Sequence, residues 1–128
     1  MGYEFTNDAE KVPKPAVNTT FDAEAVLLVR SESGTWSEKR VKITSVGQLK
    51  LLVGEGYSVE QVNVDKYHKI YYSLVNLEKY GSITAHYKSD EELHMMSAPI
   101  LLVQCDDSKP VDIMPDSLKK MKEMLDLF

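Results

Sequence analysis

Two adjacent aspartates, Asp106 and Asp107, are the residues of this sequence whose type and spacing first suggest chemistry. They follow the apolar run at residues 100–103 within the stretch SAPILLVQCDDSKP, and Asp112 lies a few residues further on. Hard cations such as Mg²⁺ prefer oxygen ligands, often one or two carboxylates together with substrate phosphates. One interpretation is therefore a metal-dependent enzyme (Mg or Mn) that acts on a phosphate-containing substrate through Asp106, Asp107 and Asp112.

The same residues also suit a turn. Adjacent residues of an extended chain point to opposite faces, so Asp106 and Asp107 converge on one ion only if the strand has already turned at Asp106. Asp and Ser side chains bond their own backbone in turns, and Pro110 fixes a φ angle. We favour a buried strand that ends in a solvated acidic turn, and in that interpretation no cofactor is expected.

The other residues that could do chemistry are isolated along the chain. His68, His86 and His94 form no His-x-His or His-x-x-x-His pair, which local metal sites commonly use. Cys105 has no Cys or His beside it, so a core thiol is favoured over a nucleophile. The sequence has no glycine-rich phosphate loop, zinc spacing, serine-based motif or dinucleotide fingerprint. An enzyme is therefore the less favoured class.

Composition predicts one globular domain. The chain has 128 residues, of which 43% are hydrophobic and 27% charged, as is usual for a soluble protein. No apolar run approaches the ~20 residues that span a bilayer, and no secretory signal is recognised, so we expect no membrane partner. One cysteine excludes an internal disulfide and suits the cytoplasm.

The acidic residues are concentrated in one segment. Residues 82–116 hold seven acidic and two basic residues, which accounts for the net charge of −5, while the rest of the chain is neutral. Binding to nucleic acid is disfavoured, because phosphate contacts need a basic surface. The segment instead predicts a protein partner with a basic surface, or a cation.

The elements that must position these residues can be read from periodicity. Residues 1–20 are expected to be a flexible arm, and residues 21–128 a single α+β domain. A β-hairpin is predicted over 23–31 and 36–44 with a turn at Ser33-Gly34, which would place Val26 opposite Val41. A short helix follows from Thr44 or Ser45 to the glycines at 54 and 56, and then a strand over 57–64.

Residues 65–80 have the strongest helical pattern. Asp65 is a suitable cap, and apolar residues recur at a spacing of three to four. Four tyrosines lie on this predicted helix. Two interpretations are open, a core helix whose hydroxyls reach the rim and an interface helix, since tyrosine combines rigid contact area with a polar tip. The four are Tyr67, Tyr71, Tyr72 and Tyr80.

The remaining segments complete the predicted sheet. A short strand over 82–89 precedes a brief helix that Ser89 would cap and that Asp90 and Glu91 would favour through the helix dipole. A central strand follows Pro99, and a final helix runs from Asp116 to the end of the chain. The fold predicted is a mixed sheet of about five strands, with two longer and one or two short helices packed mostly on one face.

The function predicted is that of a small acidic accessory or regulatory protein. It would act through protein–protein contacts and would associate with itself, and a phage or mobile element is one source expected for such a protein. Trp36 stands beside the hairpin turn, where it is either a surface aromatic or folded over the hairpin edge. The predicted partner-binding residues are Tyr67, Tyr71, Tyr72, Tyr80, Trp36, Asp90 and Glu91.

Overall fold

The part of the chain that the computed structural model describes, residues 21–54, 59–76, 83–89 and 91–128, is mostly β. Strands make up 52% of it and helices 21%, so the predicted α+β domain with a five-stranded mixed sheet is wrong. Nine strands form two antiparallel sheets, one of six strands and one of three. The predicted N-terminal arm lies outside the described residues.

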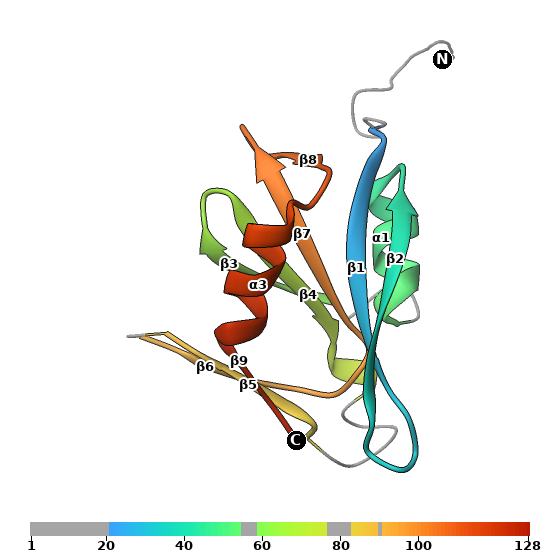
Figure 1. Cartoon of the computed structure of the whole chain (residues 1–128), viewed down its shortest axis with the longest axis vertical. Helices are drawn as coiled ribbons and strands as arrows, with labels where there is room; N and C mark the ends of the chain where they lie inside the picture. The colour runs from blue at the N-terminus through green and yellow to red at the C-terminus, as the bar shows by residue number, and fades with distance from the viewer. Residues whose placement is uncertain (1–20, 55–58, 77–82, 90) are drawn as a thin grey trace, which may run out of the picture.

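The larger sheet has the strand order β2-β1-β7-β4-β3, with β8 paired to the end of β7, and the smaller sheet has the order β6-β5-β9 (Figure 1). Residues 74–76 are helical as well. The other elements are β1 (Ala23–Arg30), β2 (Trp36–Ile43), α1 (Val46–Val53), β3 (Val59–Asp65), β4 (His68–Ser73), β5 (Ala85–Lys88), β6 (Leu93–Met96), β7 (Ile100–Asp106), β8 (Lys109–Val111), α3 (Pro115–Glu123) and β9 (Leu125–Leu127).

The first hairpin confirms the two predicted strands but corrects their register. Arg30 pairs with Trp36, so the loop spans residues 31–35, and Val26 lies opposite Arg40 rather than Val41. Gly34 has a φ of 92°, a conformation that glycine adopts without the steric cost of a side chain. The apolar β1 lies inside the sheet and the alternating β2 forms its edge, as the two patterns indicated.

The strand after Pro99 is central, as its two apolar faces predicted. β7 lies between β1 and β4, and residues 100–103 are fully buried. It ends in a two-residue turn at Asp107 and Ser108, whose φ values of 53° and 66° fit a type I′ hairpin. The acidic turn predicted at this position is confirmed, although Asp106 still belongs to the strand.

The helix predicted over 65–80 is wrong over residues 65–73, because residues 68–73 form β4; residues 74–76 are helical, and 77–80 lie outside the described residues. The backbone N–H of Tyr67 donates to Asp65 Oδ1 at 2.8 Å, so the aspartate closes the β3–β4 turn instead of capping a helix. Ile70, Tyr71 and Tyr72 then alternate between the two faces of the sheet, which suits β-branched and aromatic side chains.

One further helix was predicted where the chain forms a strand, and the predicted final helix is shorter than expected. Ser89 Oγ accepts a hydrogen bond from the N–H of Glu92 at 3.1 Å, as a helix cap would, but the chain turns back there and pairs with β5 as β6. The final helix ends at Glu123, and residues 125–127 add β9 to the smaller sheet. A serine can satisfy the same backbone donors in a turn as in a cap, so local pattern alone did not separate the two.

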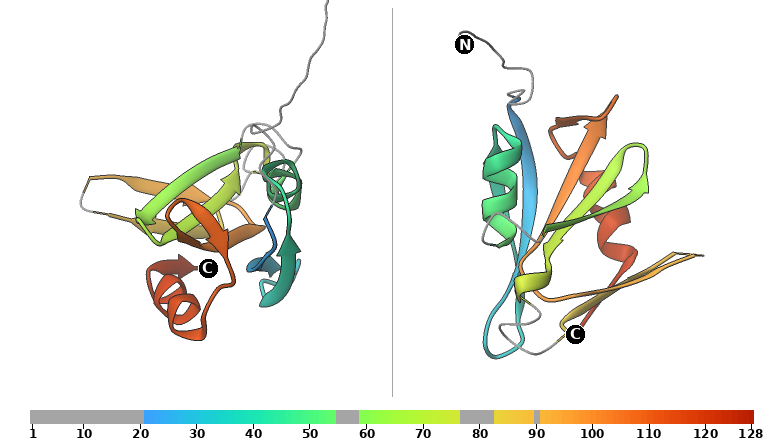
Figure 2. Two further views of the ribbon diagram at one scale, coloured as in Figure 1. Left: turned by 90° about the horizontal axis from the view of Figure 1, so that it is seen from above. Right: turned by 180° about the vertical axis from the view of Figure 1, so that it is seen from behind.

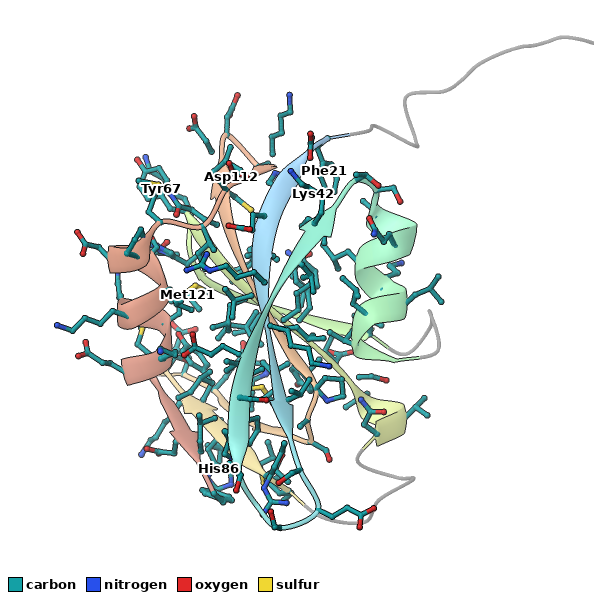
Figure 3. The ribbon with its side chains drawn as sticks, turned by 45° about the vertical axis from the view of Figure 1, so that its right-hand side comes forward. Phe21, Lys42, Tyr67, His86, Asp112 and Met121 are labelled. Atoms are coloured by element: carbon teal, nitrogen blue, oxygen red, sulfur yellow. The ribbon has the colours of Figure 1, made fainter. Side chains whose placement is uncertain are left out.

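The elements form three layers. α1 packs on one face of the larger sheet, whereas α3 and the smaller sheet cover the opposite face (Figures 1 and 2). Leu49 and Val53 of α1 meet the first face, and Leu118 and Met121 of α3 meet the second; Figure 3 shows Met121 pointing toward the sheet. The predicted arrangement with helices mostly on one face is therefore corrected. None of the described helices is long and apolar enough to cross a membrane.

α1 begins and ends where the sequence predicted. Ser45 Oγ accepts a hydrogen bond from the N–H of Gln48 at 3.2 Å, which caps the helix start, and Gly54 caps its end. The chain at Gly54 passes close to β4, because a Cβ added there would lie 2.6 Å from the Cβ of the fully buried Ser73. Glycine is needed at this position for space rather than for its dihedral angles.

The two glycines of the α1 region predict opposite responses to one substitution. Gly54→Ala should lower the free energy of unfolding by about 1–3 kcal/mol, because β4 must move to admit the methyl group. Gly47→Ala should raise it by about 0.5–1 kcal/mol, since nothing lies within 4 Å of the added Cβ and alanine favours the helix. Urea unfolding followed by circular dichroism measures both changes. A Gly54→Ala variant as stable as Gly47→Ala would contradict the close approach to Ser73.

Candidate functional site

The four tyrosines predicted as partner-binding residues do not share one surface. Tyr71 and Tyr72 are neighbours in β4 and point to opposite faces of the sheet. Tyr71 lies on the α1 side, where burial raises the pKa of its hydroxyl to about 12. Tyr72 is buried on the other side, while Tyr67 is exposed in the β3–β4 turn. Tyr80 lies outside the described residues.

Trp36 is folded over the hairpin edge, the second of its two interpretations. Its Nε1 donates a hydrogen bond to the backbone carbonyl of Phe128 at 2.9 Å, and Arg30 Nε donates to the same oxygen at 2.9 Å. The indole also packs against the core under the smaller sheet. The side chain therefore connects the first hairpin to the residues after β9.

The three aspartates of the metal interpretation are not gathered into a site. Asp106 is exposed at the end of β7, and Asp107 is exposed in the turn after it. Asp112 accepts a hydrogen bond from the N–H of Glu24 at 2.7 Å. Among the described residues, no group of three or more His, Cys, Asp or Glu side chains could hold a metal ion. The metal-dependent reading therefore stays a prediction that no observed geometry favours.

The acidic residues of the segment 82–116 also lie apart. Glu91 is exposed beside the β5–β6 turn, whereas Asp106 and Asp107 are at the tip of the β7–β8 hairpin (Figure 1). Asp90 lies outside the described residues. The described acidic residues thus supply no single surface for a basic partner. Their closeness in the sequence does not bring them close together in the folded chain.

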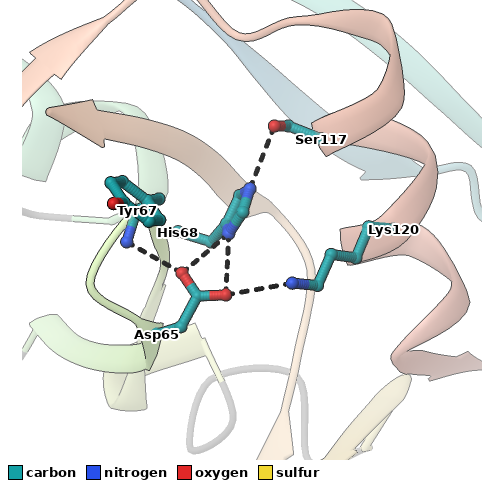
Figure 4. A network of polar contacts seen from close by, with 5 residues as sticks. All are labelled: Asp65, Tyr67, His68, Ser117 and Lys120. Carbon is teal, nitrogen blue, oxygen red and sulfur yellow. Dashed lines mark hydrogen bonds and ion pairs between the residues drawn. The ribbon is translucent and has the colours of Figure 1, made fainter.

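A polar network connects the β3–β4 turn to α3 (Figure 4). His68 Nδ1 lies 2.8 Å from Asp65 Oδ1, and His68 Nε2 lies 2.9 Å from Ser117 Oγ. Asp65 Oδ2 also accepts from Lys120 Nζ at 3.1 Å. Partial burial opposes ionisation of Asp65, but the Tyr67 N–H, Lys120 and His68 together lower its pKa to about 2.

The order Asp65–His68–Ser117 resembles the connectivity of a hydrolytic triad, but the surroundings do not suit catalysis. A nucleophile has to border a space that admits substrate, and neither His68 nor Ser117 lines any of the four best-formed cavities over the described residues. Lys120 also neutralises the carboxylate that would stabilise a charged imidazole. We therefore assign the network to stability, as the contact that holds α3 against the β3–β4 turn.

The outer face of the smaller sheet carries exposed apolar side chains. Leu93 is 53% exposed, Met95 44% and Phe128 50%. His86 lies opposite Met95 in the β5–β6 ladder, and its ring contacts Phe128 edge to face at 4.7 Å between centroids. We call these four residues the small-sheet face; Figure 3 shows His86 at the end of the molecule away from Tyr67.

Among the residues that the structure describes, no strand pairs with the outer side of β6. Ser89 N–H donates to the carbonyl of Glu92 at 2.9 Å. Ser89 directly follows β5 and Glu92 directly precedes β6, so these two residues form a hydrogen-bonded pair at the end of the β5–β6 ladder. Such pairs alternate along an antiparallel ladder, and the next bonded residue of β6 is His94. The N–H and C=O groups of Leu93 and Met95 therefore point away from β5, toward the free edge of the sheet.

Neither the small-sheet face nor the polar network was found from the sequence. The alternation of Leu93 and Met95 with His94 and Met96 was a usable signal for a strand with one apolar outer face, but the helix assigned from Ser89 hid it. The network joins residues far apart in sequence, and only the pair Asp65 and His68 could have been noticed locally. Its third member, Ser117, comes from α3.

The chain matches no family model, no curated protein and no solved structure in comparisons with known proteins.

Proposed function

We propose that this protein acts by protein–protein contact as a small accessory or regulatory protein, and that the small-sheet face with the free edge of β6 is its contact surface. The observation that carries the proposal is the exposure of Leu93, Met95 and Phe128 together on one face, beside backbone groups of β6 that no other described strand pairs with. We also propose a cytoplasmic location, in keeping with a single free cysteine. No observation favours the metal-dependent alternative.

The edges of the sheets differ in how well they are protected against pairing. Proteins guard exposed edges with charges, bulges, prolines or very short strands. β2 carries three exposed charged residues in succession, β3 is interrupted near Asn63 by a shift of register, and β8 and β9 have three residues each. β6 has four residues, and its modest length is the only one of these protective features that it has. It is therefore the edge best suited to accept a further strand.

The occupant that we propose is a second copy of the chain. An antiparallel arrangement about a two-fold axis would pair Leu93 with the partner's Met95, and Met95 with the partner's Leu93, as isologous interfaces do. The apolar side chains of both copies would then lie side by side on one continuous face. In this register Glu91 and Glu92 fall opposite residues near the partner's Met96, so no carboxylates face each other.

Sedimentation velocity over a range of concentrations tests the proposal. The wild-type chain should sediment with twice the chain mass of 14.5 kDa at the upper concentrations, and Met95→Asp should sediment as a monomer. Met95→Pro should have the same effect, since the N–H that it removes points to the free edge. A wild-type chain that stays monomeric at millimolar concentration would overturn the proposal.

Leu51→Asp is the matched control. Leu51 is 66% exposed on α1, so its substitution places the same charge on an apolar position that is more accessible than Met95 and lies on the opposite side of the molecule. It should leave the dimer intact. Loss of dimer in Leu51→Asp but not in Met95→Asp would place the interface on α1 and refute the small-sheet face.

A further inference from the structure

A cavity of about 590 Å³ lies on the α1 side of the molecule, far from the small-sheet face. Its walls are the first half of α1 and the β7–β8 hairpin, and its floor is formed by side chains of β3, β4 and β7. This volume falls in the range of about 300–1,000 Å³ that small-molecule sites occupy. The site is independent of the proposed self-association.

The lining of this cavity combines apolar and charged side chains. The cavity has an apolar part, which includes Leu49, Val59 and the ring of Tyr71. Three lysines and one aspartate line it as well, which is a positive balance in a chain of net charge −5. Within the described residues none of these lysines takes part in an ion pair. They are Lys50, Lys69 and Lys109.

Two polar groups of the floor are neutral at physiological pH. Burial raises the pKa of the Tyr71 hydroxyl, and burial also raises the pKa of the Cys105 thiol, although Lys69 opposes that shift. The floor therefore adds no negative charge that would offset the lysines. Cys105 itself is 2% exposed, so a reagent reaches it only through the cavity or by local opening.

We propose that this cavity binds a small amphipathic anion, with its apolar body between α1 and the sheet and a carboxylate or phosphate head beside Lys50, Lys69 and Lys109. An apolar body removes hydrocarbon surface from water against the floor. The head forms charge-assisted hydrogen bonds with ammonium groups, which are stronger than bonds between neutral groups. A neutral molecule of equal length lacks the second contribution, and a cationic one is repelled.

Titration of the ¹⁵N-labelled chain with decanoate, followed by amide chemical shifts, tests this inference. Decanoate below its micelle concentration should give saturable shifts around Tyr71, Cys105 and Lys109. Decyl phosphate should behave alike if any anionic head suffices, or bind less if the site selects carboxylates. Decanol and decyltrimethylammonium should bind at least about tenfold more weakly, as expected for loss of a charge-assisted hydrogen bond.

Lysine variants separate the cavity from general surface charge. Lys69→Gln should weaken decanoate binding about tenfold, whereas Lys39→Gln, on the exposed edge strand β2, should leave it unchanged. Decanoate should also slow alkylation of Cys105, the one cysteine of the chain. Equal affinity for anionic and cationic amphiphiles, shifts centred on Leu93 and Met95, or the absence of saturable shifts would each overturn the proposal.

Discussion

Leu102→Ala is expected to lower the free energy of unfolding by about 2–5 kcal/mol, the largest effect of a single side chain that we predict. Leu102 is fully buried at the centre of the larger sheet, opposite Val26 of β1 and Ile70 of β4. Its side chain lies in the core under α3 and the smaller sheet, so the truncation leaves a cavity that three elements border. Denaturant unfolding in urea measures the change.

Leu93→Ala is the control, because it makes the same chemical change on the exposed face of β6. The loss there should stay within about 0.5 kcal/mol when measured at concentrations where the chain is monomeric. A similar loss in the two variants would contradict the burial assigned to β7. The comparison also bears on the proposed interface, since a side chain that contributes little to folding is free to serve binding.

The segments that were predicted correctly are those whose structure is determined by their own local sequence. α1 has a serine at its start, a glycine at its end and an apolar stripe between them, and no distant residue is needed to define it. The centre of β7 could be recognised because a strand between two strands and two layers must be apolar on both faces. The first hairpin was also recognised from local signals, namely its turn residues and the alternation of its second strand. Its exact register, however, depended on the loop length.

The helix prediction failed over residues 65–73 because the sequence pattern there fits two periods. Apolar and aromatic residues cluster so densely from Tyr67 to Val75 that a spacing of three to four and a spacing of two both find matches. The choice was made by tertiary contacts: Asp65 closes a turn, and Ile70 enters the core beside Leu102 of β7. The side chains of β4 gain this burial only when the neighbouring strands are in place. A rule that considers only the local sequence has no information about those neighbours.

The predicted site residues lie apart for a related reason, since the predictions assumed that closeness in sequence gives closeness in space. Adjacent residues of a strand point to opposite faces, which separates Tyr71 from Tyr72. Hairpins carry their turns to the ends of a sheet, which separates Glu91 from Asp106. The same alternation brings Leu93 and Met95 together on one exposed face, so the surface with the clearest capacity for binding became visible only with the strand assignment.

Asp65→Ala is expected to lower the free energy of unfolding by about 2–3 kcal/mol at neutral pH. The substitution removes the acceptor of the Tyr67 N–H and the partner of His68, which is 7% exposed and keeps only Ser117. The ion pair with Lys120 adds little, since the lysine side chain is 53% exposed. Asp106→Ala, at an exposed carboxylate, should change stability by less than about 0.5 kcal/mol.

The part of the Asp65 contribution that depends on its negative charge should disappear in acid. Its pKa is lowered from the ordinary value of 3.8 to about 2 in the folded chain, so the unfolded chain takes up its proton first as the pH falls. The stabilisation is complete above the unfolded pKa and is lost as the pH falls through the folded one. The side chain is 34% exposed, so the loss between about pH 5 and pH 2 is on the order of 1 kcal/mol.

Unfolding free energies of wild type and Asp65→Asn, measured from pH 7 to pH 2, isolate this contribution. The amide keeps the shape of the side chain and accepts one hydrogen bond but does not titrate, so the difference between the two proteins should shrink toward acid. Asp106→Asn, with its exposed carboxylate, should follow the wild-type curve throughout. A constant difference between wild type and Asp65→Asn over this range would mean that the carboxylate charge does not hold the β3–β4 turn against α3.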